Sequence, residues 1–152
     1  MLSEKLISFC KNKGWWYDDV EPKYRDALLK LGIDTSSDFA HFYLHAEDGP
    51  TFLSRKREIY QICWFFINYN YIDSLQRTRE ALKISEPYIP MDGFEGDFGF
   101  FYNKTTGEVV GLGLGGDLKK FSDGNMRPQW GDFNSFIEWF FELSIENDSR
   151  FA

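Results

Sequence analysis

The chain has 152 residues, 43% of them hydrophobic, and its 24 acidic and 17 basic side chains give a net charge of −7. The apolar content excludes a disordered chain. The negative charge argues against direct nucleic-acid binding, which needs a basic face to hold phosphates. The length predicts a single domain over residues 1–152.

Hydrophobic spacing predicts three helices in the first third of the chain, over residues 2–11, 22–31 and 37–46. Pro22 suits the first turn of the second helix, and Gly32 ends it. Ser36 or Ser37 caps the third helix.

The segment 58–68 fits two structures. Ile59, Ile62, Cys63 and Phe66 follow helical spacing, but β-branched and aromatic residues also suit a buried strand. We favour a helix and keep the strand as the alternative. A further helix is predicted over residues 72–83.

The pattern changes after Pro87. Short strands are predicted at 88–91, 98–102 and 108–112, with a hairpin turn at 103–107 between the last two. A glycine-rich loop with Lys119 and Lys120 follows. A final helix is predicted over 132–147, capped by Asp132. Helices on either side of a run of hairpin strands predict an α+β fold: a mostly antiparallel sheet on which N-terminal helices and a C-terminal helix pack.

Cysteine usage and apolar run lengths indicate the compartment. Cys10 and Cys63 lack C-x-x-C spacing and lie in apolar surroundings, so we expect buried free thiols, as in a reducing compartment. No apolar run approaches the roughly 20 residues of a membrane span, and the charged N-terminus does not resemble a signal peptide. We expect a cytoplasmic protein without membrane contact.

The acidic side chains are concentrated in the second part of the chain. Residues 1–85 hold 12 acids and 12 bases, whereas residues 86–152 hold 12 acids and five bases. Within 86–117, six acids face one base, Lys104. These charges are either solvated loop residues or an acidic face for a basic protein partner. The acids that we assign to such a face are Asp92, Glu95, Asp97 and Asp117.

Patterns that carry catalytic or metal chemistry are weak. His41 and His45 have the i, i+4 spacing of paired metal ligands, but they are expected on the outer helix face without an H-E-x-x-H motif. The glycines of 111–116 match G-x-G-x-x-G in letters, although they do not follow a first strand as a dinucleotide site requires. We therefore predict no catalytic residue, metal or cofactor.

Large aromatic residues next to glycines and charges form two further groups, Trp15-Trp16-Tyr17 and Trp130. They are either lids packed over the core or anchors of an interface, since Trp and Tyr are frequent at binding hot spots. We include Trp130 among the expected partner-binding residues.

Over most of residues 22–145 the sequence resembles the SUKH superfamily of bacterial immunity proteins, which is related to a yeast cell-wall regulator family. The matching pieces, in order, are Ser37-Asp38-Phe39 through Asp48-Gly49, Glu58 to Trp64, Tyr88-Ile89-Pro90, Phe94 to Tyr102, Thr106 to Val110, and Trp130 with Phe133 to Ile137. One position departs from the pattern, because Asp97 stands where many members have a glycine.

The resemblance implies a small α+β domain that binds a cognate toxin of a polymorphic toxin system and blocks it. Many such toxins are nucleases with basic surfaces, which an acidic inhibitor fits. Two other hypotheses stay open at this point. One is a regulatory or scaffold interaction domain of the same fold. The other is a small metal-dependent enzyme that uses His41 and His45.

Overall fold

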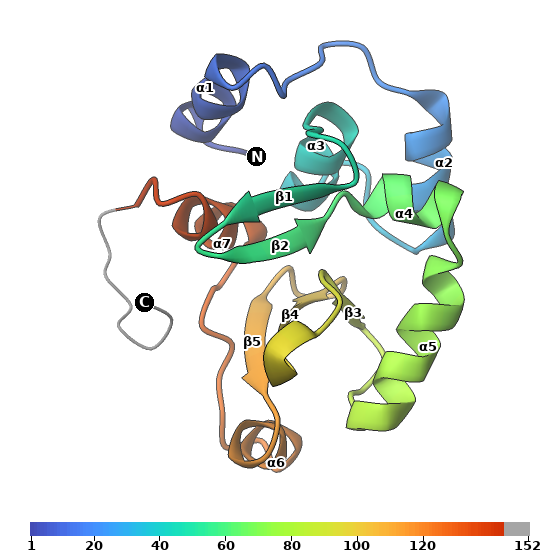
Figure 1. Cartoon of the computed structure of the whole chain (residues 1–152), viewed down its shortest axis with the longest axis vertical. Coiled ribbons are helices and arrows are strands. Elements are labelled where there is room, and N and C mark those ends of the chain that lie inside the picture. Colours follow the sequence, from blue (N-terminus) through green and yellow to red (C-terminus); the bar gives the residue numbers. More distant parts are fainter. Residues whose placement is uncertain (145–152) are drawn as a thin grey trace.

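The computed structural model describes residues 1–144 and has the α+β fold that was predicted (Figure 1). The helices of this part are α1 (Glu4–Asn12), α2 (Pro22–Lys30), α3 (Asp38–His45), α4 (Ile62–Asn68), α5 (Tyr71–Leu82), α6 (Gly116–Ser122) and α7 (Phe133–Phe140), with a 3₁₀ turn η1 (Glu95–Asp97). The strands are β1 (Thr51–Ser54), β2 (Arg57–Tyr60), β3 (Tyr88–Pro90), β4 (Phe98–Asn103) and β5 (Val109–Gly113).

The strands form two antiparallel sheets. β1 and β2 make a hairpin, and β3, β4 and β5 make a three-stranded sheet with β4 in the middle. In Figure 1 the hairpin crosses the centre of the molecule, with the larger sheet below it and α6 at the lower end. The backbone N–H of Tyr60 donates to the carbonyl of Met91 at 2.8 Å, which ties the end of β2 to the chain after β3.

The predicted N-terminal helices are confirmed, with ends within two residues of those expected. Ser37 caps α3, because its hydroxyl accepts the N–H of Ala40 at 3.1 Å. Phe39 and Phe42 are fully buried, as their helical spacing predicted. Both cysteines are also buried as free thiols.

The helix favoured over residues 58–68 is wrong in its first part, where Arg57–Tyr60 is strand β2. Gln61 makes the change from strand to helix, because its side-chain oxygen accepts the N–H groups of Cys63 and Trp64 at the start of α4. Its amide nitrogen donates to the carbonyls of Tyr43 and Ala46, so this buried side chain also joins α4 to α3.

The β1–β2 hairpin was not predicted. Its two turn residues, Arg55 and Lys56, both have positive φ, as in the I′ type of hairpin turn. Such turns usually carry Asn-Gly or Asp-Gly, so the sequence has no turn signal here. Arg55 is held instead by tertiary contacts: its guanidinium lies 4.1 Å from the ring centre of Trp139 and donates to the Trp139 carbonyl.

Both faces of the three-stranded sheet are covered. Phe100 and Tyr102 of β4 face the main core, whereas Phe101 between them faces a second cluster that includes Val110 and Leu112. Helix α6 helps to cover that second cluster through Leu118 and Phe121. The loop predicted around Lys119 and Lys120 is therefore wrong, because the second face of this sheet carries apolar side chains, which α6 covers.

The last helix of the described residues, α7, is shorter than predicted. Asp132 caps it by accepting the N–H of Ser135 at 2.7 Å, as expected, but the helix ends at Phe140 and Glu142 takes a left-handed φ of 61°. Residues 145–147 of the predicted helix lie outside the described residues.

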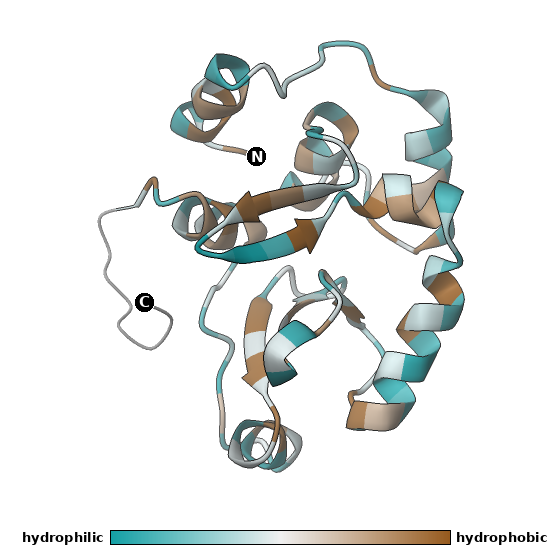
Figure 2. Cartoon of the chain, viewed as in Figure 1, coloured by the Kyte–Doolittle hydropathy of each residue, from teal (hydrophilic) through white to brown (hydrophobic). Residues whose placement is uncertain are grey.

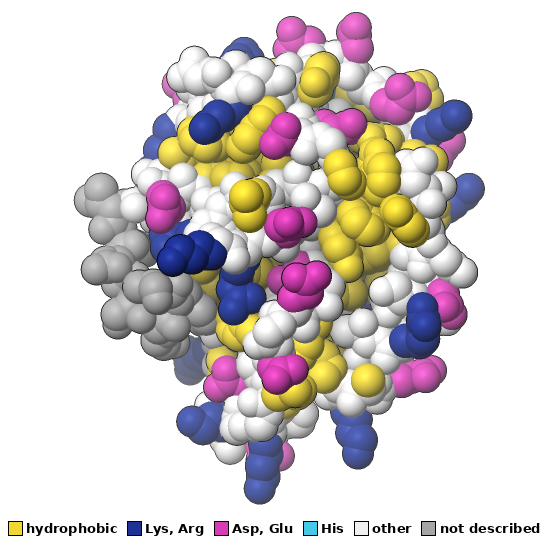
Figure 3. Space-filling model, in the orientation of Figure 1, with side chains coloured by type: hydrophobic (Ala, Val, Ile, Leu, Met, Phe, Trp, Pro, Cys, Tyr) yellow, Lys and Arg dark blue, Asp and Glu magenta, His cyan; other side chains and the backbone are white. Residues whose placement is uncertain are grey.

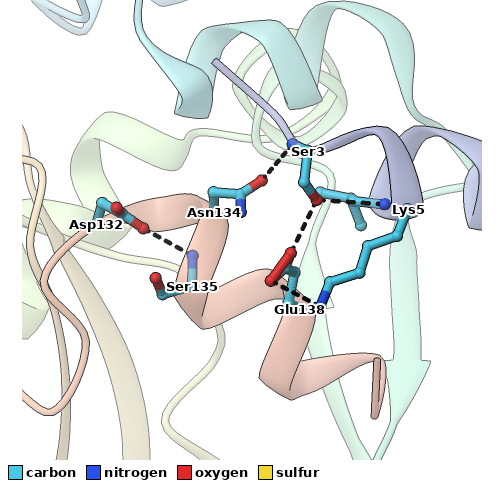
Figure 4. A network of polar contacts seen from close by, with 7 residues as sticks. Ser3, Lys5, Asp132, Asn134, Ser135 and Glu138 are labelled. Carbon is cyan, nitrogen blue, oxygen red and sulfur yellow. Dashed lines mark hydrogen bonds and ion pairs between the residues drawn. The ribbon is translucent and has the colours of Figure 1, made fainter. Parts of the chain in front are cut away.

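Polar contacts fix the start of α1 against α7 (Figure 4). The Ser3 backbone N–H donates to the side-chain oxygen of Asn134, and its hydroxyl donates to Glu138, both at 2.8 Å. Lys5 forms an ion pair with the same Glu138 carboxylate at 3.5 Å. These contacts join the two ends of the described chain across the core.

Candidate protein-binding surface

An acidic turn, residues 92–97, precedes the central strand of the larger sheet. Phe94, Gly96 and Asp97 all have φ between 55° and 66°, the left-handed region that L side chains rarely adopt. Asp97 therefore has a conformation that favours glycine, at the position where the resemblance expects one. The side chains of Glu95 and Asp97 are exposed.

Asp92 holds this turn from inside. One carboxylate oxygen accepts the N–H of Phe94 at 3.1 Å and the other accepts the N–H of Phe100 at 3.3 Å. Gly99 makes room for it, because a Cβ there would lie 2.6 Å from the Asp92 carboxylate. The carboxylate thus links the turn to the strand that follows.

The electrostatics of Asp92 are set mainly by burial. Burial raises the pKa of its carboxyl to about 7, although the two N–H donors and the charge of Arg57 favour the ionised form. Asp92 is 8% exposed. It therefore supports the acidic turn rather than forming part of its surface, which corrects its expected place on an exposed acidic face.

The structure brings some of the expected acids together and separates others. The backbone carbonyl of Asp97 and the carboxylate of Asp117 both lie next to Gly113, whose N–H donates to the Asp117 carboxylate at 3.2 Å. Glu86 and Glu108 lie near the opposite end of the strands, where Tyr88 pairs with Asn103. The acids of residues 86–117 thus form two groups, and Glu95, Asp97 and Asp117 belong to the group beside the acidic turn.

Trp130 is a core residue in this structure. Its backbone pairs with Val109 at the edge of β5, and its ring lies 5.1 Å from Phe136 and 4.9 Å from Trp139. Only 7% of the residue is exposed. This burial corrects the prediction that Trp130 anchors an interface. Its ring instead fills the space between β4, β5 and α7.

The Trp15-Trp16-Tyr17 segment divides between both interpretations, because Trp15 and Trp16 are half-buried whereas Tyr17 is 55% exposed. Trp15 is a lid on the core, with its ring 5.7 Å from Phe52. Trp16 stacks on His45 at 5.0 Å and contacts His41 by its edge, so these histidines are half-buried rather than fully exposed. Burial and the neighbouring His45 lower the pKa of His41.

A second group of aromatic side chains, which the sequence reasoning did not single out, lies at the surface. It consists of Tyr60 at the end of β2 with Trp64, Phe65 and Tyr69 of α4 and its C-terminal cap, and we call it the aromatic surface. Figure 2 shows α4 as mostly apolar, and hydrophobic side chains gather in this part of the face in Figure 3. One feature of the sequence could have indicated this surface: residues 61–72 contain no charged side chain.

A cavity of about 470 Å³ lies on another side of α4. Ile67 and Asn68 line it together with Asp19, Glu21 and Glu47. The Tyr24 hydroxyl donates a hydrogen bond to the Glu47 carboxylate, with 2.5 Å between the two oxygens. Burial and this hydrogen bond raise the pKa of the Tyr24 hydroxyl. The cavity also contains Lys23, so its acidic excess is partly balanced.

Within residues 1–144 no group of three or more His, Cys, Asp or Glu side chains is placed to hold a metal ion. No helix in that range is long and apolar enough to cross a membrane. No family model, curated protein or solved structure matches the chain. The resemblance to the SUKH superfamily therefore stays a prediction based on the residues quoted for it.

Proposed function

We propose that the protein is an immunity protein, which binds a basic toxin domain and blocks it by occupying the surface that holds the toxin's substrate. The observation that carries this proposal is the acidic turn. Glu95 and Asp97 extend from a backbone that Asp92 holds in an uncommon conformation. Strained, well-supported backbone of this kind concentrates at functional positions.

A rigid acidic turn suits this mode of inhibition for two physical reasons. Carboxylates on a pre-ordered backbone lose little conformational entropy when they bind, so more of the interaction energy appears as affinity. Their charge also attracts a basic partner during diffusion and speeds association. A nuclease toxin, which must hold phosphates, would offer such a basic surface.

Catalysis by Asp92 is the function that its raised pKa would otherwise favour, because general acids and bases often have a pKa near 7. The geometry argues against it. Both carboxylate oxygens accept backbone N–H groups, and Asp92 does not line the cavity beside α4. Its contacts support a structural role.

The test uses co-expression and titration. We expect the gene directly upstream to encode a large secreted toxin, and its C-terminal domain should be lethal alone and harmless when this protein is present. One equivalent of the purified protein should silence one equivalent of toxin, and activity should return when the complex dissociates. Silencing by far less than one equivalent would contradict occlusion and favour an enzyme.

A double variant, His41→Ala with His45→Ala, serves as the control for metal or proton-transfer chemistry. Protection should persist in it, because these rings pack on Trp16 and lie outside the acidic turn. Loss of protection in a folded double variant would favour the metal-dependent enzyme. A purified protein with no effect on the toxin would favour the regulatory or scaffold role.

A further inference from the structure

Helix α4 is apolar on every side but is only partly covered by protein. Its residues Ile62 and Cys63 are fully buried, whereas Trp64 and Phe65 are half-buried and Ile67 is 40% exposed. Tyr69, which caps the helix, is 63% exposed. A helix without a polar face is normally buried, and apolar side chains that gather at the surface are typical of interaction sites.

The aromatic side chains of this surface form a continuous row. The ring of Tyr60 stacks on Phe65 at 4.0 Å, and Phe65 in turn stacks on Tyr69 at 5.4 Å. Trp64 lies 5.3 Å from Phe65 and 5.6 Å from Tyr69. Each ring is thus held in place by its neighbours, so the row is pre-ordered for contact with a partner.

One end of the row meets the acidic turn. A Cβ on Gly93 would lie 3.2 Å from the Tyr60 hydroxyl and 3.9 Å from a carboxylate oxygen of Glu95, so these two groups flank the same position. The charges of Asp92 and Glu95 add to burial in raising the pKa of Tyr60. The aromatic surface and the acidic turn are therefore contiguous.

We propose that the aromatic surface and Glu95 together form the anchor site for a basic segment of the partner protein. The aliphatic stem of an arginine or lysine lies across Tyr60, Phe65 and Tyr69, and its charged head reaches the Glu95 carboxylate. Long basic side chains bury their stems on apolar surface in this way, and their cations are attracted to aromatic rings. This inference rests on the proposed function and names the chemistry that its partner presents.

The charges around the surface select this occupant over two others. Glu95 lies beside Tyr60 at one end of the aromatic row, and the cavity beside Ile67 and Asn68 holds three acids, Asp19, Glu21 and Glu47, against Lys23. A second copy packed symmetrically on α4 would bring the acidic side chains of the two copies toward one another, which is unfavourable. An anionic membrane surface would be repelled in the same way.

The first experiment needs no toxin. The full chain, labelled with ¹⁵N, is titrated with an octa-arginine peptide, with octa-glutamate, and with vesicles of phosphatidylcholine and phosphatidylserine. Octa-arginine should shift the amide signals of residues 61–72 and 93–97, whereas the other two should not. Shifts from octa-arginine only elsewhere on the chain, or equal shifts from the vesicles, would overturn the proposal.

The second experiment uses variants of exposed side chains, which are expected to fold. Tyr69→Ser and Glu95→Gln should each weaken binding of octa-arginine, and of the upstream-encoded toxin domain, by about tenfold or more. Matched controls are Leu53→Ser, an apolar residue of β1 that is 66% exposed, and Glu86→Gln near the other end of the larger sheet. Both controls should bind within about twofold of wild type.

The two proposals fail in different ways. If the wild type binds the toxin tightly and both test variants bind it equally well, the anchor site is wrong while the proposed function stands. If the wild type binds no toxin but octa-arginine binding requires Tyr69 and Glu95, the proposed function is wrong while the surface chemistry is supported.

Discussion

Two groups of aromatic side chains, one in the core and one on α4, differ in what surrounds them. Phe100 of β4 and Phe136 and Phe140 of α7 are completely buried, and their rings lie 5.0 to 6.4 Å apart. Tyr60, Phe65 and Tyr69 are stacked at similar distances but remain partly exposed. The two groups have similar chemistry and similar ring contacts.

The comparison separates stability from binding. In the core group, the sheet and α7 close over the rings from both sides, so the buried area contributes to folding. In the surface group, only Ile62 and Cys63 of α4 are fully buried; Tyr60 and Phe65 pack against the core on one side, and the apolar area left exposed is available to a partner. Four predictions, from the largest effect to the smallest, test this division.

The largest effect is expected in the core. Phe140→Ala leaves a cavity and should lower the free energy of unfolding by about 3–5 kcal/mol, which is a large part of a total of about 5–15 kcal/mol. Thermal melting should show a midpoint roughly 10 °C lower. Tyr69→Ser should leave the midpoint nearly unchanged. Equal losses in both variants would remove the distinction between the two groups.

Asp92 connects the core to the acidic turn, and its effect should depend on pH. Its folded pKa of about 7 lies above the ordinary value of 3.8, so between these values the folded state binds more protons than the unfolded state. The contribution of Asp92 to the free energy of unfolding is therefore fully present below about pH 4 and is lost as the pH rises through 7. The loss is at most about 1.4 kcal/mol per pH unit.

Urea unfolding at pH 4.5, 6 and 7.5 measures this effect. The wild type should lose stability with rising pH relative to Asp92→Asn, in which the group cannot ionise. The charge of Arg57 and the two N–H donors lower the pKa of Asp92 and so oppose the effect of burial, whereas the charge of Glu95 raises this pKa further. Curves that stay parallel between the two proteins would show that Asp92 does not titrate in this range.

The exposed acids of the turn should affect association and leave stability unchanged. Reversing Glu95 and Asp97 to Lys should slow association with a basic toxin domain by about tenfold at low ionic strength. For the wild type the rate should fall with added salt, as the screening length shrinks from about 10 Å at 0.1 M to about 3 Å at 1 M. Stopped-flow rates that are flat over this range would contradict steering.

The smallest effect concerns Asp97 itself. Asp97→Gly removes the side chain from a residue with a φ of 59°, where glycine is unstrained. The variant should be as stable as the wild type or up to about 1 kcal/mol more stable, while its binding to the toxin domain weakens. A clear loss of stability, measured by urea unfolding, would mean that Asp97 serves the fold.

Much of the fold was predictable because its signals are local. Ser37 and Asp132 cap their helices as expected, and the turn at 103–107 joins β4 to β5 with Gly107 at positive φ. These residues act through atoms three or four positions away. The β1–β2 hairpin escaped prediction because its turn residues are Arg55 and Lys56, and contacts to the distant Trp139 hold one of them.

The candidate site was only partly predictable, for a related reason. Glu95 and Asp97 are exposed on the acidic turn, as expected of a binding face, but Asp92 and Trp130 are buried. Sequence patterns describe a residue's type and its near neighbours. They do not state whether a distant strand or helix covers it, as α7 covers Trp130 and β4 covers Asp92.

The sequence by itself determined the α+β class, most helix ends and the excess of acids after residue 86, since these depend on composition and on short-range spacing. Tertiary structure decided which acids and which aromatic residues reach the surface. It brought Tyr60 of β2 against Phe65 of α4 and placed the Tyr60 hydroxyl beside Glu95, more than 25 positions further along the chain. Burial and proximity of this kind arise only when elements far apart in sequence pack together, because each side chain is covered by the elements on the other side of the core.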